Sequence, residues 1–398
     1  MKNIYILFCV FILFSCKGDF EHEPIGGKGG AAPEPVKNAR VLRNTPGGAI
    51  IAYELPDNVD IQYIKAEYTT TKGKVKDVKS SSYVDTLTIK GLGDTSPRTV
   101  KLYSVNRQEV ASEPVEITIN PLTPPILSVR ESLGYFVDFG GFKITFKDND
   151  SREELGVYVL VQDSISVDML EWDAQFKTSE ADTLSVRGLP NKENKFGVYI
   201  RDRWDNISDT LYFTLTPWRE DYLNKKLFKA ISVAGDVGWN YHGGSPEKAY
   251  DDNVGNGNFA HTNFPEEFPH RYTLDLGVNA KLSRFLLWQR PGADVLFQHG
   301  APKYYKVYGR ADDPKGGSSS DPLGGWILLM ECTSKKPSGL PLGQNSSEDE
   351  EYAARGEEFS FPRDIPDVRY LRFEMIESWS GMKCSVVSEL AFYGEIKD

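Results

Sequence analysis

An internal repeat constrains the fold of this chain more than any other feature of its sequence. Residues 84–92 recur about 97 positions later as residues 181–189; both copies contain Asp-Thr-Leu from their second residue and close on Gly-Leu. A period of this length is that of a β-sandwich domain and is far longer than a solenoid repeat. The repeat therefore predicts two related modules, at residues 34–121 and 122–217.

Short segments of β-forming residues lie between turns in both modules. Residues 49–53 and 63–68 are rich in β-branched and aromatic side chains, and residues 142–146 and 211–215 alternate apolar with polar positions. Strands spaced about 8–12 residues apart between turns are typical of a β-sandwich. We therefore expect an all-β chain with two consecutive Ig/fibronectin-like β-sandwiches. The first module, with its Pro-Glu-Pro-Val start, resembles a fibronectin type III domain.

The composition is that of a globular, acidic protein. Of its 398 residues, 40% are hydrophobic and 26% are charged, so several domains can each bury a core. The net charge is −11, which argues against a nucleic-acid partner, because binding to phosphates needs a surplus of Lys and Arg. The acidic balance identifies no other partner.

The N-terminus reads as an export signal. A short basic start precedes an apolar run at residues 4–14, which is shorter than the roughly 20 residues that span a bilayer. Leu13-Phe14-Ser15-Cys16 resembles the bacterial lipobox, which implies a signal peptide at residues 1–15 and a lipid on Cys16. The alternative is a plain signal peptide with a chance cysteine.

The segment after the signal is rich in Gly, Pro and acidic residues. Residues 16–33 predict a flexible tether between the lipid and the folded part. The acid-rich run at residues 17–23 resembles the surface-export signals of Bacteroidetes lipoproteins, which implies an outer-membrane lipoprotein exposed at the cell surface. In an exported protein the two late cysteines, Cys332 and Cys384, can form a disulfide, but the sequence does not place them within bonding range.

The last region, residues 218–398, resembles the discoidin family, also called coagulation-factor type C. Three segments carry the resemblance, at residues 245–262, 272–290 and 369–394. The resemblance implies a galactose-binding-like β-jelly roll. Four of the five His and four of the seven Trp lie in residues 227–398, so recognition chemistry is expected here.

The discoidin resemblance also implies a structural cation. Its ligands would be the Lys248 carbonyl, Asp251, Asn253, Asn258, the Ser388 carbonyl and Glu389. Ca²⁺ takes about 6–8 oxygen ligands, and an acidic turn with one distant carboxylate supplies that chemistry. The alternative is an Asp/Asn turn that satisfies its own backbone, and the choice between Ca²⁺ and Na⁺ stays open.

The family's ligand site lies in loops at one end of the jelly roll. The resemblance implies ligand-binding roles for His261, Arg290, Phe297, Gln298, Trp379 and Trp239. Planar polar groups would bond sugar hydroxyls while an aromatic face packs on the pyranose ring. Two alternatives remain: His261 buttresses the cation loop, or Arg290 forms a local salt bridge.

No sequence motif of a catalytic site is present: there is no His-Glu-x-x-His, Gly-x-Ser-x-Gly or phosphate-binding loop. We therefore expect a protein that is not an enzyme. The whole arrangement resembles lipoproteins of Bacteroidetes glycan-utilisation loci, which implies glycan capture beside an outer-membrane importer. Two other hypotheses are a structural or adhesive lipoprotein that binds a protein partner, and a cryptic glycosidase.

Overall fold

The computed structural model describes residues 30–57, 60–147, 152–163, 168–178, 182–315 and 318–397. The predicted signal peptide, the lipidation site Cys16 and most of the predicted tether lie outside these ranges. Across the ranges that are described, none of the helices has the length and apolar character needed to cross a membrane.

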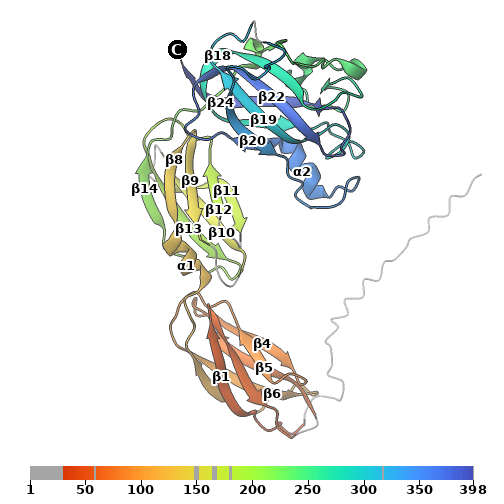
Figure 1. Ribbon diagram of the computed structural model, residues 1–398. Helices are drawn as coiled ribbons and strands as arrows, with labels where there is room; N and C mark the ends of the chain where they lie inside the picture. Colours follow the sequence, from red (N-terminus) through yellow and green to blue (C-terminus); the bar gives the residue numbers. More distant parts are fainter. Residues whose placement is uncertain are drawn as a thin grey trace, which may run out of the picture. The chain divides into compact units, whose positions relative to one another are not determined.

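The first module consists of two antiparallel sheets (Figure 1). One has the order β1-β2-β5, with β1 at Lys37–Thr45, β2 at Gly48–Glu54 and β5 at Thr86–Ile89. The other has the order β4-β3-β6-β7 and consists of β4 (Val75–Ser81), β3 (Ile61–Thr69), β6 (Arg98–Asn106) and β7 (Val115–Ile119). Alternate side chains of both sheets, such as Ile51 and Ile64, are fully buried in one hydrophobic core.

The second module repeats this strand order seven strands later. Its three-stranded sheet runs β12-β9-β8 and its four-stranded sheet β11-β10-β13-β14. A short helix α1 (Pro125–Ser132) precedes β8 (Gly134–Asp138), β9 (Gly141–Phe146), β10 (Leu155–Gln162), β11 (Met169–Thr178), β12 (Asp182–Val186), β13 (Asn194–Asp202) and β14 (Leu211–Leu215). The internal repeat of the sequence is therefore a repeat of topology.

The Gly-Leu pair that ends both copies of the repeated segment makes the same contact in both modules. The Leu92 amide donates to the Gly47 carbonyl at 2.9 Å, and the Leu189 amide donates to the Gly140 carbonyl at 2.9 Å. Both receiving glycines adopt φ of +61°, a conformation that Gly reaches without steric cost. The Gly-Leu pair thus docks the repeated strand on the turn of the neighbouring hairpin.

The C-terminal region forms a jelly roll around one long strand. β18 (His270–Trp288) pairs with β22 (Val368–Ser378) and the short β16 (Lys229–Ile231) in its first part. In its second part it pairs with β24 (Glu389–Lys397) and β21 (Glu357–Ser360). The change of partners coincides with Gly277, at φ of +73°, whose amide donates to Asp275. The bend lets one strand serve both layers of the jelly roll.

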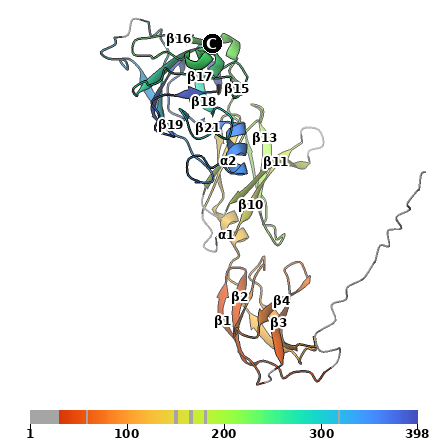
Figure 2. The same cartoon turned by 90° about the vertical axis from the view of Figure 1, so that its right-hand side faces the viewer.

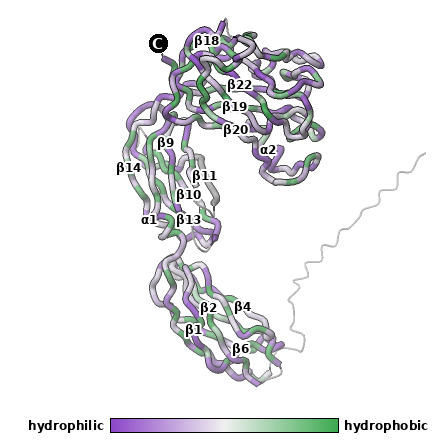
Figure 3. Tube along the Cα trace, viewed as in Figure 1, coloured by the Kyte–Doolittle hydropathy of each residue, from purple (hydrophilic) through white to green (hydrophobic). Residues whose placement is uncertain are grey.

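The remaining elements complete this domain. The main sheet has the order β15-β24-β18-β22-β19-β20, and β17 pairs with β23 (Figures 1 and 2). The elements are β15 (Asp221–Tyr222), η1 (Lys225–Leu227), η2 (Tyr241–Gly243), η3 (Pro246–Ala249), β17 (Ala260–His261), β19 (Pro302–Arg310), β20 (Ile327–Thr333), α2 (Ser347–Arg355) and β23 (Val386–Val387). Along the strands, hydrophobic stretches alternate with hydrophilic ones (Figure 3).

The core of the jelly roll is aromatic. Phe285, Tyr305, Phe373 and Phe392 are each fully buried and pack with ring centroids 5.5–6.5 Å apart. The predicted fold class is confirmed: the chain is all-β, with two fibronectin-like sandwiches followed by a discoidin-like jelly roll.

Candidate functional site

Backbone hydrogen bonds join the loops that contain the predicted ligand-binding residues. The His261 amide donates to Trp239, the Val386 amide donates to Gly300 at 2.8 Å, and the Trp379 amide donates to Ala301 at 2.9 Å. Segments far apart in the sequence therefore meet beside the small β17–β23 sheet. This end of the jelly roll is the candidate functional site.

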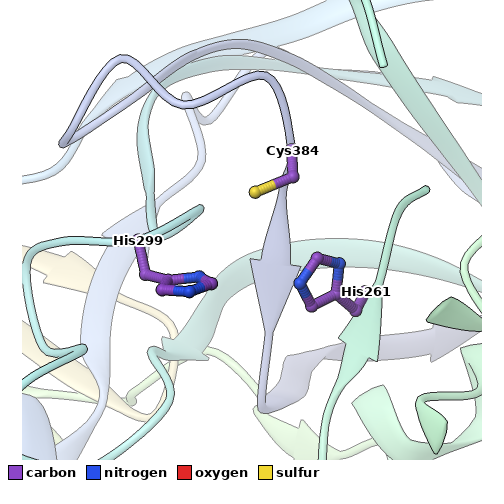
Figure 4. Close-up of side chains that lie close together, drawn as sticks. All are labelled: His261, His299 and Cys384. Carbon is purple, nitrogen blue, oxygen red and sulfur yellow. The ribbon is translucent and has the colours of Figure 1, made fainter. Parts of the chain in front are cut away.

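A cluster of sulfur and imidazole groups lies at the centre of these loops. One ligand atom from each of His261, His299 and Cys384 lies within 4.8 Å of the other two. Figure 4 shows both imidazole rings and the thiol directed toward a common point. His261 and Cys384 are buried and His299 is half-buried.

Burial sets the charge of the two histidines. Desolvation lowers the pKa of His261 and His299, and the charge of nearby Arg290 lowers both further. Both imidazoles are therefore expected to be neutral at pH 7. His242, exposed on η2, adds a third imidazole, with its ring centroid 5.9 Å from that of His261.

Arg290 lies beside this cluster and is held by an amide side chain. Its Nε donates to the backbone and side-chain oxygens of Asn256, both at 2.7 Å, and its Cζ lies 4.7 Å from the Phe259 ring centroid. Among the described residues no carboxylate forms an ion pair with it, and Asn256 holds it instead of the local salt bridge that was the alternative. Its two terminal NH₂ groups have no partner among the described residues and remain available as donors.

The aromatic predictions need correction at two positions. Trp239 is 3% exposed, because its ring packs edge-on against Tyr272 and its indole N–H donates to the Arg271 carbonyl at 2.9 Å. Phe297 is completely buried beneath Trp379, with ring centroids 5.5 Å apart. Neither ring can present a face to a sugar.

The indole ring of Trp379 is partly exposed at this end of the domain. Its indole N–H donates to the Ser334 hydroxyl at 3.1 Å, and Lys303 Nζ lies 5.8 Å from the ring centroid. Gln298 is half-buried, and its side-chain amide lies near the Cα of Gly343. Of the predicted residues, Arg290 therefore lies near His261, and Trp379 packs on the buried Phe297.

The predicted cation ligands also come together, but with hydrogen bonds among themselves. Asp251 accepts from the Asn253 amide at 3.1 Å and from the Asn258 side chain at 2.8 Å. The Ser388 hydroxyl donates to the Asn258 carbonyl at 2.9 Å, while the Lys248 ammonium donates to Gly243. This pattern of hydrogen bonds is the one expected for the alternative interpretation, in which an acidic turn satisfies its own backbone.

A lysine that the sequence analysis did not single out occupies the acidic centre. Lys225, on η1, donates to Glu389 at 2.5 Å and contacts Asp252 at 2.7 Å. Burial opposes its charge, but hydrogen bonds with Asp252 and Glu389 outweigh that cost and raise the pKa of the Lys225 ammonium. The ammonium bonds the Oε1 of Glu389, so a divalent ion on the Oε2, which is buried and has no hydrogen-bond partner among the described residues, would lie next to a like charge. The residues therefore do not fit Ca²⁺ while Lys225 holds this position.

The two late cysteines are free and buried, so the structure shows no bridge between Cys332 and Cys384. Cys332 lies on β20 next to Tyr305, whereas Cys384 lies beside the histidines. Sequence reasoning missed His299, Cys384 and Lys225 as site residues. His299 and Cys384 lie in loops beside predicted ligands, whereas Lys225 lies on η1, 164 residues from Glu389, and had no such signal.

Most of the chain matches known protein families. Residues 33–121, 122–226 and 250–394 match three families, DUF4959, DUF5126 and DUF5000, each described as a domain of unknown function. A search of curated proteins found none that matches this chain.

Solved structures similar to parts of the chain include a carbohydrate-binding module. The family 32 module from C. perfringens NanJ, solved with galactose, is 17% identical over 44% of this chain and 98% of its own, with a TM-score of 0.30. A two-domain fibronectin type III segment from chicken tenascin is 14% identical over 46% of this chain and 99% of its own, with a TM-score of 0.23.

One solved structure is much more similar in sequence. It is a SusE-like protein, 35% identical to this chain over 69% of this chain and 100% of its own length, with a TM-score of 0.45. Sequence identity of 35% over the whole length of the similar protein shows common descent. The chain therefore belongs to the SusE-like protein family.

Proposed function

We propose that this protein captures glycans at the cell surface as part of a polysaccharide-utilisation system. Its C-terminal jelly roll binds the glycan, the two sandwich modules act as spacers, and a lipid on Cys16 anchors the chain to the outer membrane beside an importer. The protein acts without catalysis. Its membership of the SusE-like family supports the pathway, and the loops around β17 and β23 supply the binding chemistry.

The observation that carries the proposal is the free donor face of Arg290. Asn256 fixes one edge of the guanidinium, and no described carboxylate covers the other. A planar donor held in place loses little entropy when it bonds sugar hydroxyls. His261 is 2% exposed and contributes no contact to the sugar, whereas Trp379 offers a partly exposed ring at the same end of the jelly roll. Such a combination is typical of sites that bind sugars weakly and specifically.

Weak single sites suit a lipid-anchored protein. Many copies on one membrane hold a polymer at several points, so the overall affinity exceeds that of one site. The experiment that tests the proposal is a binding assay of the full chain, without its N-terminal signal, against neutral and acidic polysaccharides in EDTA. We expect binding to at least one glycan class.

Two substitutions locate the site. A charged hydrogen bond contributes about 1.5–3 kcal/mol. Arg290→Gln should therefore weaken glycan binding by about tenfold or more. Trp379→Ala should also weaken it, because the ring face is lost. Arg355→Gln and Trp326→Ala are the matched controls, since these residues lie elsewhere on the jelly roll, and neither should change binding.

Three outcomes separate the hypotheses. Binding that is lost only in the site variants supports the proposal. A folded wild-type protein that binds no glycan would refute it and favour the adhesive role with a protein partner. Release of reducing sugar by the purified protein would refute the non-catalytic role.

A further inference from the structure

The triad of His261, His299 and Cys384 has no function in the fold described so far. It lies outside the acidic turn that was expected to bind a cation, and it contains no carboxylate. We propose that these three residues form a binding site for a zinc-type transition-metal ion. The ion would be held by two imidazole nitrogens and one thiolate.

Distances within the triad are close to those that a metal ion needs. The three ligand atoms lie within 4.8 Å of one another. With Zn–N bonds of about 2.0–2.1 Å and a Zn–S bond of about 2.3 Å, tetrahedral ligands stand about 3.4–3.6 Å apart. Small side-chain rotations close this difference. The rings and the thiol already converge on one point (Figure 4).

The tautomer of His261 is set for metal binding. Its Nδ1 lies 2.6 Å from the Thr262 carbonyl oxygen, which can only accept a hydrogen bond. Nδ1 therefore carries the proton and Nε2 carries the free lone pair. A metal-binding histidine commonly donates its second N–H to a backbone carbonyl, which fixes the ring and raises the basicity of the ligand nitrogen.

His299 provides a second, independent indication. Its Nδ1 is buried and has no hydrogen-bond partner among the described residues. A buried polar atom without a partner costs about 1–3 kcal/mol, so its presence needs a reason. His299 also adopts φ of +46°, an unusual backbone conformation for a non-glycine residue that is often found at functional sites. A metal ion bound at this nitrogen would supply the missing partner.

The donor set selects the class of metal. Nitrogen and sulfur ligands suit Zn²⁺ and Co²⁺, whereas Ca²⁺ and Mg²⁺ require oxygen. Binding converts the Cys384 thiol into a thiolate and releases one proton to solvent, so no oxidant or reductant is involved. The thiolate leaves the ion with one net positive charge, which limits repulsion from Arg290. Three protein ligands leave a fourth position open for water.

The test uses Co²⁺ as a spectroscopic probe with the chelator-treated full chain, which carries no polyhistidine tag. A cysteine thiolate on Co²⁺ gives an intense charge-transfer band in the near ultraviolet. We expect this band to saturate at one Co²⁺ per chain and to vanish when Zn²⁺ displaces the probe. Cys384→Ser should abolish the band, and the control Cys332→Ser should leave it intact.

A second variant keeps the test valid if Cys384→Ser fails to fold. His299 is half-buried, so His299→Gln should fold, and its Co²⁺ affinity should fall by about tenfold or more. A wild-type protein without the band would overturn the proposal, as would a band that survives Cys384→Ser. The assay contains no glycan, and the glycan assay contains EDTA, so neither result depends on the other.

Discussion

Lys225 serves as a built-in cation for a buried carboxylate, and its removal should destabilise the jelly roll. Its side chain is 6% exposed, and its ammonium contacts Glu389, whose side chain is 2% exposed. Lys225→Met keeps the length and apolar stem of the side chain but deletes the charge. Glu389 then remains buried with no opposite charge in contact.

The expected loss is large because the remaining charge is buried. Removing one partner of a buried ion pair costs about 3–5 kcal/mol. For a domain of this size, about 1 kcal/mol shifts the melting temperature by about 2–4 °C, so we expect a fall of about 6–20 °C. Lys226→Met is the matched control, because Lys226 is exposed, and it should change the melting temperature little. Scanning calorimetry of the full chain measures both.

The pH dependence provides a second readout with a defined sign. Burial raises the pKa of Glu389, and Lys225 opposes that rise. In Lys225→Met the opposing interaction is gone, so the pKa of Glu389 rises further. A folded-state pKa above the unfolded value means that the stability from this group is present at low pH and lost as pH rises. The deficit of Lys225→Met should therefore be greater at pH 7.5 than at pH 5.

A calcium titration completes the experiment. The wild type should show no change in melting temperature with Ca²⁺, whereas Ca²⁺ should restore part of the stability of Lys225→Met. Lys225→Met with Glu389→Gln should be more stable than Lys225→Met alone, because no charge is left buried. The reasoning would be refuted by a loss as small as that of Lys226→Met, by a deficit that grows toward pH 5, or by stabilisation of the wild type by Ca²⁺.

Three further substitutions test other parts of the jelly roll. Arg372, 1% exposed, donates to Asp236 and to two loop carbonyls, so Arg372→Met should cost about 3–5 kcal/mol in calorimetry. Ser346 caps α2 by accepting from an amide of its first turn, so Ser346→Ala should cost about 1 kcal/mol in urea unfolding; no loss would show that the cap is unimportant. Burial lowers the pKa of His270, so the unfolded chain binds the proton more readily. Stability should therefore fall as pH drops below about 6.5, and His270→Gln should flatten that fall; an unchanged pH profile would contradict the assignment.

Local patterns in the sequence were sufficient to predict the two sandwich modules. The repeat around Leu87 and the alternation in residues 142–146 report which side chains face a core, and this information is contained in neighbouring residues. The positions of Pro and Gly and the lengths of the strands then limit which turns can connect these strands. The two sandwich modules could be predicted for this reason, whereas the jelly roll was implied by the discoidin resemblance, which also placed His261 and Arg290 at one end of the domain.

The exposure of single aromatic side chains depends on contacts between distant segments. Trp239 and Phe297 both lie in loops, where the sequence suggested exposed rings. Tyr272 covers the first and Trp379 the second, and neither contact leaves a local pattern. The position of an aromatic residue in a loop therefore does not predict whether its ring is exposed to solvent or covered by another segment.

The chemistry of the two clusters was decided by tertiary structure alone. Lys225 and Glu389 are 164 residues apart, and His261 and Cys384 are 123 residues apart. Folding brings each pair together through strands that are paired in space and remote in the chain. A sequence shows which residues could donate a charge or a lone pair, but only the packed fold determines which of them share one buried volume, where their interactions are strong.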